Sequence, residues 1–264
     1  MDEPELSAGL HGRATSVPGL TYRAFRLLWR VLAALLGFRL VLEGGEHLPR
    51  DSDGRPVGGW ILAGMPHRTW VDPFPPWILL PARPRLAFFG DARMMARSGI
   101  RRFLIERLGG VVPIPSGRDP KTVEVHLAAA AEVLRAGAIF MLFPETGPPS
   151  EVGHLRRLGG GLGYFALRNR APIVPVIFGG NDELYVGRRL VMRVLPALDP
   201  VELAGLEPTA ALPDPGSSAE RAAVHRLTQA LAERVAPDVL AVHEDAVPPP
   251  GTKKRGRFLT TLFR

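Results

Sequence analysis

The 264-residue sequence contains no cysteine, and this absence removes several chemistries at once. Disulfide bridges, thiolate metal sites and a covalent cysteine mechanism all need a sulfhydryl group. Long apolar runs are missing too, because the longest charge-free run near the N-terminus covers residues 31–38, whereas a spanning helix needs about 20 apolar residues. We therefore expect no transmembrane helix, and any nucleophilic step must use a group other than a thiol.

Two kinds of catalytic motif are also missing. The sequence contains no G-x-S-x-G elbow, which argues against a serine hydrolase, although a histidine and an acid would supply two members of a triad. The seven histidines are scattered, with neither H-E-x-x-H nor H-x-x-x-H spacing. Since the aspartates form no ligand cluster either, we expect no metal site.

The overall composition is typical of one globular domain with a basic surface. A hydrophobic content of 46% is enough for a full core in a chain of this length. The net charge of +7 comes almost wholly from arginine. Anionic lipid, a phosphorylated small molecule or nucleic acid would each complement that charge, and an arginine surface exposed only to solvent is the alternative.

Short apolar runs alternate with helical patterns along the chain. The runs cover residues 59–64, 86–90, 109–114, 138–143, 171–178 and 190–195. Their nearly continuous apolar character is typical of strands buried on both faces of a parallel sheet. The pattern predicts helices over residues 121–135 and 219–235. We therefore predict an α/β fold with a mostly parallel central sheet flanked by helices.

Both ends of the chain combine apolar and basic residues. We expect a disordered N-terminus over residues 1–19, an amphipathic membrane-associated helix over 20–44, the main domain over 45–240 and a basic tail over 241–264. In the tail, Phe258, Leu259, Leu262 and Phe263 recur at helical spacing among five basic residues, a pattern that suits anionic lipid headgroups. A helix that merely covers the core and a disordered tail without a role are the alternatives.

The stretch MPHRTWVDPF places His67 and Asp72 five residues apart. Five residues of an ideal helix turn through about 500°, so the two side chains could not share a face, and a turn must separate them. Asp72 precedes Pro73, as an N-cap precedes the first helical position, so we place His67 in a loop and Asp72 at the start of a helix. A carboxylate bonded to the imidazole would make His67 a candidate general base. Alternatively, Asp72 only caps the helix and His67 is a surface histidine.

A second polar stretch, LFPETGPPS over residues 142–150, follows a predicted buried strand. Ligands bind at strand ends in open α/β sheets. Glu145, Thr146 and Gly147 could there offer acceptors, a donor and a close backbone approach. An ordinary proline and glycine turn is the alternative interpretation.

Taken in order, the blocks HRTWVD, LGGVVPIPSGR, FPETG and APIVPV resemble the four sequence blocks of the lysophospholipid acyltransferase family. The resemblance runs from about residue 40 to 200, and the family's histidine and aspartate match His67 and Asp72. It implies the glycerolipid acyltransferase fold for the main domain and no cofactor. It also implies acyl transfer from acyl-CoA or acyl carrier protein to a lysophospholipid, foremost 1-acylglycerol-3-phosphate. From the apolar and basic ends of the chain we expect a peripheral or monotopic protein at the cytoplasmic face of the cell membrane.

The same resemblance implies roles for individual residues. His67 would be the general base and Asp72 would fix its tautomer, while Arg68 and Glu145 would belong to the acceptor site. Thr146 and Gly147 would stand at the rim of that site. The basic ends of the chain, by contrast, predict an anionic membrane surface as a partner. We expect no binding of nucleic acid, because the sequence shows no recognised nucleic-acid motif.

Two departures from the family pattern concern the acceptor's phosphate. The third block usually reads Phe-Pro-Glu-Gly-Thr-Arg-Ser, and here the arginine is missing. In the second block, Arg118 falls about two residues later than the family's arginine. Arg118, Arg156 and Arg157 could replace the phosphate-binding arginines, since a guanidinium binds phosphate in a bidentate fork. Otherwise the acceptor is another lipid, such as an amino-acid-linked lipid or a glycolipid, or the protein is a non-enzymatic membrane-binding module.

Overall fold

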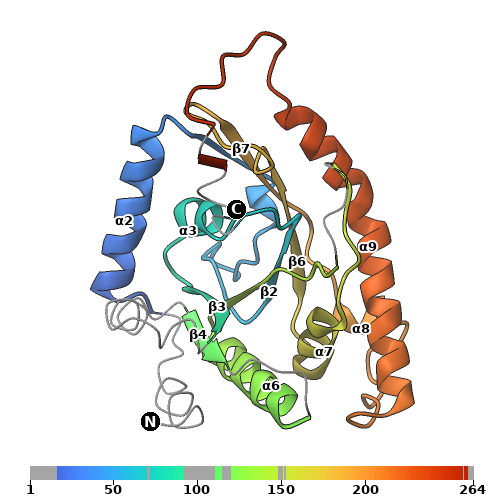
Figure 1. Cartoon of the computed structure of the whole chain (residues 1–264). Helices are drawn as coiled ribbons and strands as arrows, with labels where there is room; N and C mark the ends of the chain where they lie inside the picture. The colour runs from blue at the N-terminus through green and yellow to red at the C-terminus, as the bar shows by residue number, and fades with distance from the viewer. Residues whose placement is uncertain are drawn as a thin grey trace.

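The computed structural model describes residues 17–69, 72–91, 111–114, 120–147, 151, 153–257 and 259–260. Within these ranges a seven-stranded sheet is covered by helices on both faces (Figure 1). The expected α/β fold with a mostly parallel central sheet is confirmed.

The order of the strands brings together the loops that follow β2, β5 and β6. Their bounds are β1 Arg39–Glu43, β2 Ile61–Met65, β3 Leu86–Asp91, β4 Val111–Ile114, β5 Ile139–Leu142, β6 Ile173–Gly179 and β7 Arg189–Val194. Their order is β1-β7-β6-β2-β5-β3-β4, and every pair of neighbours is parallel except β6 and β7. Because β2 lies between β5 and β6, the loops that follow these three strands leave the same edge of the sheet.

Helices pack on both faces of the sheet, and a separate apolar cluster lies between the sheet and the helices on each face. The helices are α2 Leu20–Leu35, α3 Phe74–Leu79, α6 Pro120–Arg135, α7 Gly160–Asn169, α8 Pro200–Leu203 and α9 Ser218–Ala246, with a short 3-10 turn, η1, at Gly45–His47. One cluster joins Tyr22 of α2 and Trp77 of α3 to Leu62 of β2. The other joins Leu227 of α9 to Phe140 of β5. Apolar residues on both faces of the strands thus fill two cores, as their continuous apolar runs predict.

Two predicted boundaries are wrong. The helix predicted over residues 20–44 ends at Leu35, because Gly37 adopts a left-handed φ of 65° that turns the chain into β1. The last helix continues past residue 235 to Ala246, through Pro237, because Val239 and Val242 extend its buried stripe. The proposed boundary at residue 240 therefore falls inside α9. The expectation for residues 1–19 falls almost wholly outside the described ranges.

Aromatic side chains hold α2 against α3. The rings of Trp29 and Phe74 stack with centroids 3.6 Å apart, and Phe25 meets Trp77 edge to face at 5.0 Å. The Tyr22 hydroxyl, on the same face, accepts a hydrogen bond from the backbone N–H of Leu86, and burial raises the pKa of Tyr22. One face of α2 therefore covers the core. None of the described helices combines the length and the hydropathy that a membrane-spanning segment requires.

The described part of the C-terminal tail packs on the domain. Leu259 is buried against Leu184 and Leu190, and the Thr260 hydroxyl accepts a hydrogen bond of 2.8 Å from the backbone N–H of Leu184. Lys254 forms an ion pair with Glu183, and this contact lowers the pKa of the Glu183 carboxyl. Leu259 is thus part of the protein interior. Phe258, Leu262 and Phe263 lie outside the described residues.

Candidate active site

The candidate site lies where three adjacent strands end. His67 follows β2 by two residues, after a cis peptide bond between Met65 and Pro66. Glu145 follows β5, and Asn181 follows β6. The carboxyl ends of neighbouring parallel strands are where open α/β sheets place their ligands, so the topology brings these side chains together.

Asp72 is a buried carboxylate surrounded by hydrogen-bond donors. Its Oδ2 accepts from the backbone N–H groups of Arg68 and Thr69, at 2.7 and 2.8 Å, and lies 2.9 Å from Nδ1 of His67. Its Oδ1 accepts from the Thr69 hydroxyl at 2.8 Å and from Nδ2 of Asn181 at 3.0 Å. These charge-assisted bonds compensate for the loss of water around the buried charge.

The expectation that Asp72 caps a helix is wrong. Helix α3 begins at Phe74, its N-cap residue is Pro73, and no side chain accepts a capping hydrogen bond. The Asp72 carboxylate points instead toward the backbone of its own loop and toward His67. The same short side chain that favours caps also suits this closed turn, since Asp72 N–H donates to Thr69 O at 3.2 Å.

His67 presents one ring nitrogen to the surroundings of the site. Because Asp72 can only accept while ionised, Nδ1 carries the hydrogen, and Nε2 is left with its lone pair. The imidazole stacks on Phe143, with ring centroids 4.2 Å apart and planes 25° apart, and 41% of the His67 side chain is exposed. The ring is therefore oriented on one side by a carboxylate and accessible on the other.

Glu145 connects two loops through its carboxylate. Oε2 accepts from the backbone N–H of His67 at 2.7 Å, and Oε1 accepts from the backbone N–H of Arg156 at 2.8 Å. Each oxygen thus holds backbone, so Glu145 shapes the site by bracing the histidine loop. Thr146 is exposed and donates its N–H to Arg157 O at 2.8 Å, and Gly147 is exposed at a φ of 88°. Both residues are exposed on the loop that follows β5.

Two arginines lie beside this brace. Nη2 of Arg68 donates to Glu151 O and His154 O, at 3.2 and 2.9 Å. Burial lowers the pKa of Arg68, the Glu145 charge raises it, and the like charge of Arg156 lowers it again. Nε of Arg156 is buried and has no hydrogen-bond partner among the described residues.

Of the other two arginines that could bind the acceptor's phosphate, only Arg157 lies within the described residues. Arg157 is exposed, and its backbone oxygen accepts the Thr146 hydroxyl at 3.2 Å. Arg118 lies outside the described residues. Across the described ranges, no group of three or more histidine, aspartate or glutamate side chains is arranged to hold a metal ion.

Asn181 is the site residue that sequence reasoning missed. Gly180 has a φ of 83°, and a Cβ there would lie 2.2 Å from Arg189 O, so the turn needs glycine. Nε of the buried Arg188 secures this turn by donating to Gly180 O at 2.9 Å. Asn181 then donates to Pro66 O at 3.1 Å as well as to Asp72. Asn181 and Asp72 are 109 residues apart in the sequence, and the only local signal for Asn181 is the Gly-Gly-Asn turn after the fourth block.

We expect Asn181→Ala to lower kcat about tenfold with little change in KM. The change removes a donor that fixes the Asp72 carboxylate and the Pro66 carbonyl, a loss worth about 1–3 kcal/mol when a buried partner is left unsatisfied. Steady-state kinetics and a thermal melt check this. Asn169→Ala, which loses one side-chain bond to Phe165 O on α7, is the matched control and should leave kcat unchanged. A wild-type kcat in Asn181→Ala would show that Asn181 does not position Asp72.

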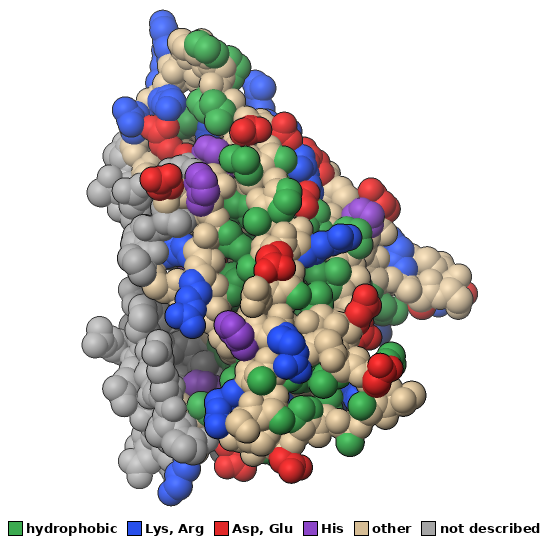
Figure 2. Space-filling view, turned by 90° about the vertical axis from the view of Figure 1, so that its right-hand side faces the viewer, with side chains coloured by type: hydrophobic (Ala, Val, Ile, Leu, Met, Phe, Trp, Pro, Cys, Tyr) green, Lys and Arg blue, Asp and Glu red, His purple; other side chains and the backbone are tan. Residues whose placement is uncertain are grey.

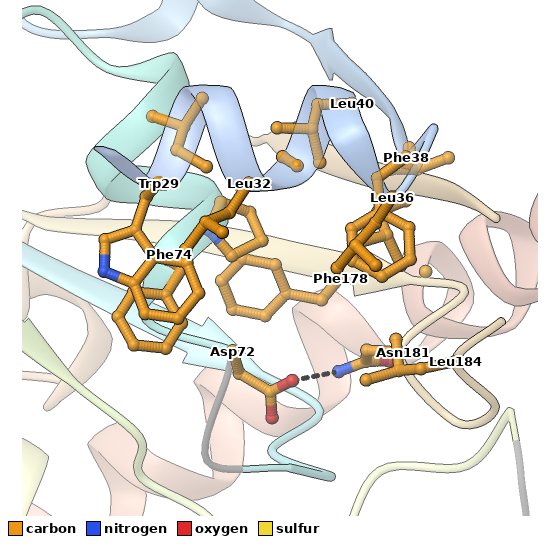
Figure 3. Close-up of a pocket in the computed structure, with 16 residues that line it drawn as sticks. Trp29, Leu32, Leu36, Phe38, Leu40, Asp72, Phe74, Phe178, Asn181 and Leu184 are labelled. Atoms are coloured by element: carbon orange, nitrogen blue, oxygen red, sulfur yellow. Dashed lines mark hydrogen bonds between the residues drawn. The ribbon is translucent and has the colours of Figure 1, made fainter. Parts of the chain in front are cut away.

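An apolar pocket extends from Asp72 and Asn181 to the underside of α2 (Figure 3). Trp29 and Leu32 of α2, Phe74 of α3 and Phe178 of β6 line it. It leaves about 50 Å³ for the centres of water-sized spheres, so it is a narrow slot. Such a lining suits a hydrocarbon chain.

Comparisons with known proteins agree with this geometry. The family model described as Acyltransferase matches residues 39–179, more than half of the chain, and includes His67, Asp72 and Glu145. The crystal structure of the 1-acyl-sn-glycerophosphate (LPA) acyltransferase PlsC from Thermotoga maritima has a similar fold, with a TM-score of 0.57 and 18% sequence identity over 83% of this chain and 80% of that chain. A comparison with curated proteins finds no match. The chain therefore belongs to the acyltransferase family and is an acyltransferase enzyme with a PlsC-like fold.

Proposed function

We propose that this enzyme transfers a fatty acyl group from acyl-CoA or acyl carrier protein to the hydroxyl of a lysophospholipid, namely 1-acylglycerol-3-phosphate, to give phosphatidic acid. The observation that carries the proposal is the half-exposed His67 whose Nδ1 lies 2.9 Å from the buried Asp72 carboxylate. The similar fold of PlsC, itself a 1-acyl-sn-glycerophosphate acyltransferase, supports the choice of acceptor.

The proposed reaction is a direct transfer. Nε2 of His67 removes the proton from the acceptor hydroxyl as the oxygen attacks the thioester carbonyl. The tetrahedral intermediate then breaks its C–S bond, and the leaving thiolate takes the proton from the imidazolium of His67. Asp72 holds the ring in the required tautomer and stabilises the imidazolium that forms between the two steps. Because a thioester is already activated, no covalent enzyme intermediate is required.

The apolar pocket would hold a few methylene groups of a fatty acyl chain, because its volume of about 50 Å³ is well below the roughly 300–1,000 Å³ of a typical ligand site. Its polar end lies at Asp72 and Asn181, which support the catalytic histidine, and its apolar lining continues under α2. Methylene groups in this slot would be buried beside Asp72 and Asn181. Each buried methylene contributes about 0.8 kcal/mol, so a close fit in the slot would favour binding strongly.

Arg156 is the proposed phosphate ligand in place of the family's missing arginine. Its Nε is buried without a hydrogen-bond partner among the described residues, and its charge acts on Arg68 beside the histidine loop. The two positive charges of Arg68 and Arg156 would attract an anion, and a guanidinium binds phosphate in a bidentate fork. Arg157 is exposed and fits this role less well.

We expect Arg156→Gln to raise KM for 1-acylglycerol-3-phosphate roughly tenfold, because one charge-assisted bond contributes about 1.5–3 kcal/mol. The change in kcat should be small. Arg157→Gln removes the same charge one residue away and is the matched control. Acceptor titrations that show equal KM values for the two variants would move the phosphate elsewhere.

We further propose that the enzyme works at the cytoplasmic face of the cell membrane as a peripheral or monotopic protein. A lipid acceptor requires access to a lipid surface. Helix α2 supplies a face for it, since several of its large apolar side chains are exposed. These side chains are Leu20, Leu27, Leu28, Val31 and Leu35.

A different lipid acceptor is the second candidate, because Pro148 stands at the position of the arginine in the family's third block. Thiol release from acyl-CoA and from acyl carrier protein, measured with 1-acylglycerol-3-phosphate, other lysolipids or no acceptor, separates the two. Release that depends on 1-acylglycerol-3-phosphate supports the proposal, and release that depends on another lysolipid favours the alternative. The retention of both His67 and Asp72, whose side chains lie 2.9 Å apart, argues against a non-enzymatic binding module built on a degenerated acyltransferase scaffold.

A further inference from the structure

A second groove lies away from the catalytic pair, between α2, the end of α3 and the η1 segment. Four arginines, Arg23, Arg26, Arg30 and Arg50, line it together with Leu27 and Leu79. It leaves about 550 Å³ for the centres of water-sized spheres. A space of this size is comparable to small-molecule sites of roughly 300–1,000 Å³.

The topology of the sheet separates this groove from the active site. Strand β7 is antiparallel to β6, and β1 is parallel to β7, so β1 runs opposite to β2. Leu42, near the carboxyl end of β1, also lines the groove. The groove therefore lies toward the edge of the sheet opposite to His67, and its occupant is not the reacting acceptor.

Two arginines of the groove bond to backbone carbonyl oxygens. Arg26 donates to Leu80 O at 2.6 Å and to Pro81 O at 3.1 Å, and Arg30 donates to Ile78 O at 2.9 Å. These carbonyls at the end of α3 fix the guanidinium groups. Among the ion pairs of the described residues, none includes an arginine of the groove.

The electrostatics of Arg26 agree with this account. Its side chain is only 6% exposed, and burial lowers its pKa. The neighbour that raises this pKa is the Tyr22 hydroxyl, and the charge of Arg30 lowers it further. A buried guanidinium beside a like charge leaves favourable binding energy for an incoming anion.

An exposed apolar stripe borders the groove. Leu27 lines the groove and is 62% exposed. Leu20, Leu28, Val31 and Leu35 are exposed at spacings that place them on the same side of α2 as Leu27, away from the aromatic cluster. A complementary occupant is therefore anionic at one end and apolar beside it.

We propose that this groove binds the headgroup of an anionic phospholipid of a bilayer, with the leucine stripe of α2 inserted among the acyl chains. The inference rests on the proposed membrane location and names the lipid class and the residues that hold it. The charge and the apolar stripe recognise different parts of one lipid. The bound lipid anchors the enzyme and is not consumed.

The test measures how much protein sediments with vesicles of phosphatidylcholine alone or mixed with phosphatidylglycerol. The groove variant is Arg23→Gln with Arg50→Gln, two exposed positions whose side chains do not bond to the end of α3. The matched control, Arg135→Gln with Arg234→Gln, removes the same charge from α6 and α9, on the other side of the molecule (Figure 1). There basic and acidic side chains are interspersed over the α9 face (Figure 2).

We expect the groove variant to bind the mixed vesicles about 25-fold more weakly, since each arginine near an anionic surface contributes roughly fivefold. The control pair should bind like the wild type. Leu27→Ser with Leu28→Ser should weaken binding to both vesicle types. Wild-type binding by the groove variant, or an equal loss in the control pair, would overturn the proposal.

Two further measurements identify what is bound. An excess of glycerol 3-phosphate should leave the bound fraction unchanged, and displacement would assign the groove to a free phosphate ester. Thermal melts verify that each variant is folded. Because sedimentation needs neither acyl donor nor turnover, the groove can fail this test while the proposed transferase activity stands, and the reverse also holds.

Discussion

His67→Ala should lower the rate of acyl transfer by about 10²–10⁴-fold, the range expected for removal of a general base. The variant should remain folded. The His67 side chain is half-exposed, and alanine retains the backbone N–H that donates to Glu145 at 2.7 Å. The lost contacts are the bond to Asp72 and the stacking on Phe143. Initial rates of thiol release at saturating acceptor, together with a thermal melt, give both quantities.

The matched control is His225→Ala, an exposed histidine on α9 that makes no side-chain contact with the site. This control should show wild-type rates and melting. A folded His67→Ala protein that turns over normally would remove His67 from the mechanism. The proton would then have to leave through another group.

Asp72→Asn should lower kcat by about 10²–10³-fold while KM changes little, because the imidazolium of His67 loses its compensating charge. The geometry permits this substitution in one orientation. The amide oxygen must face the backbone N–H groups of Arg68 and Thr69 and Nδ1 of His67, since those backbone donors cannot be inverted. The amide nitrogen then faces the Thr69 hydroxyl, which can turn to accept, and Asn181, which can present its amide oxygen only by losing its bond to Pro66 O.

Asp72→Ala separates the catalytic from the structural contribution. It leaves five donors without an acceptor in a buried site, so we expect a loss of about 3 kcal/mol or more in the free energy of unfolding. Asp72→Asn should lose much less stability and nearly as much activity. Chemical denaturation and steady-state kinetics measure the two effects. If Asp72→Asn retained the wild-type kcat, Asp72 would have a structural role only.

Much of the fold could be predicted because its signals are local. Apolar runs such as 171–178 belong to strands buried on both faces, and alanine-rich α6 ends close to its predicted bounds. Strand β1 was missed because residues 39–43 continue the apolar and basic pattern of α2, and its strand conformation depends on pairing with β7. The end of α9 was missed because Pro237 resembles a helix stop, whereas packing on the sheet continues the helix.

The residues of the site could be predicted better than the contacts between them, because Glu145 could be placed by the strand before it and by the third block, but its partner could not. The spacing of His67 and Asp72 in a turn indicates the pair, and the structure brings their side chains together at 2.9 Å. Long-range contacts determine the rest. Glu145 lies 78 residues from His67, and its carboxylate braces backbone N–H groups, an arrangement that no short motif encodes. Asn181 depends on the adjacency of β6 and β2 in the sheet.

The most direct test of the proposed function follows the acyl group itself. The wild-type enzyme is incubated with an isotope-labelled acyl thioester and 1-acylglycerol-3-phosphate, and the lipids are identified by mass spectrometry while released thiol is counted. The account predicts labelled phosphatidic acid in a one-to-one ratio with thiol. Labelled free fatty acid in that ratio, without labelled phosphatidic acid, would instead identify a thioesterase and contradict the proposed acyl transfer.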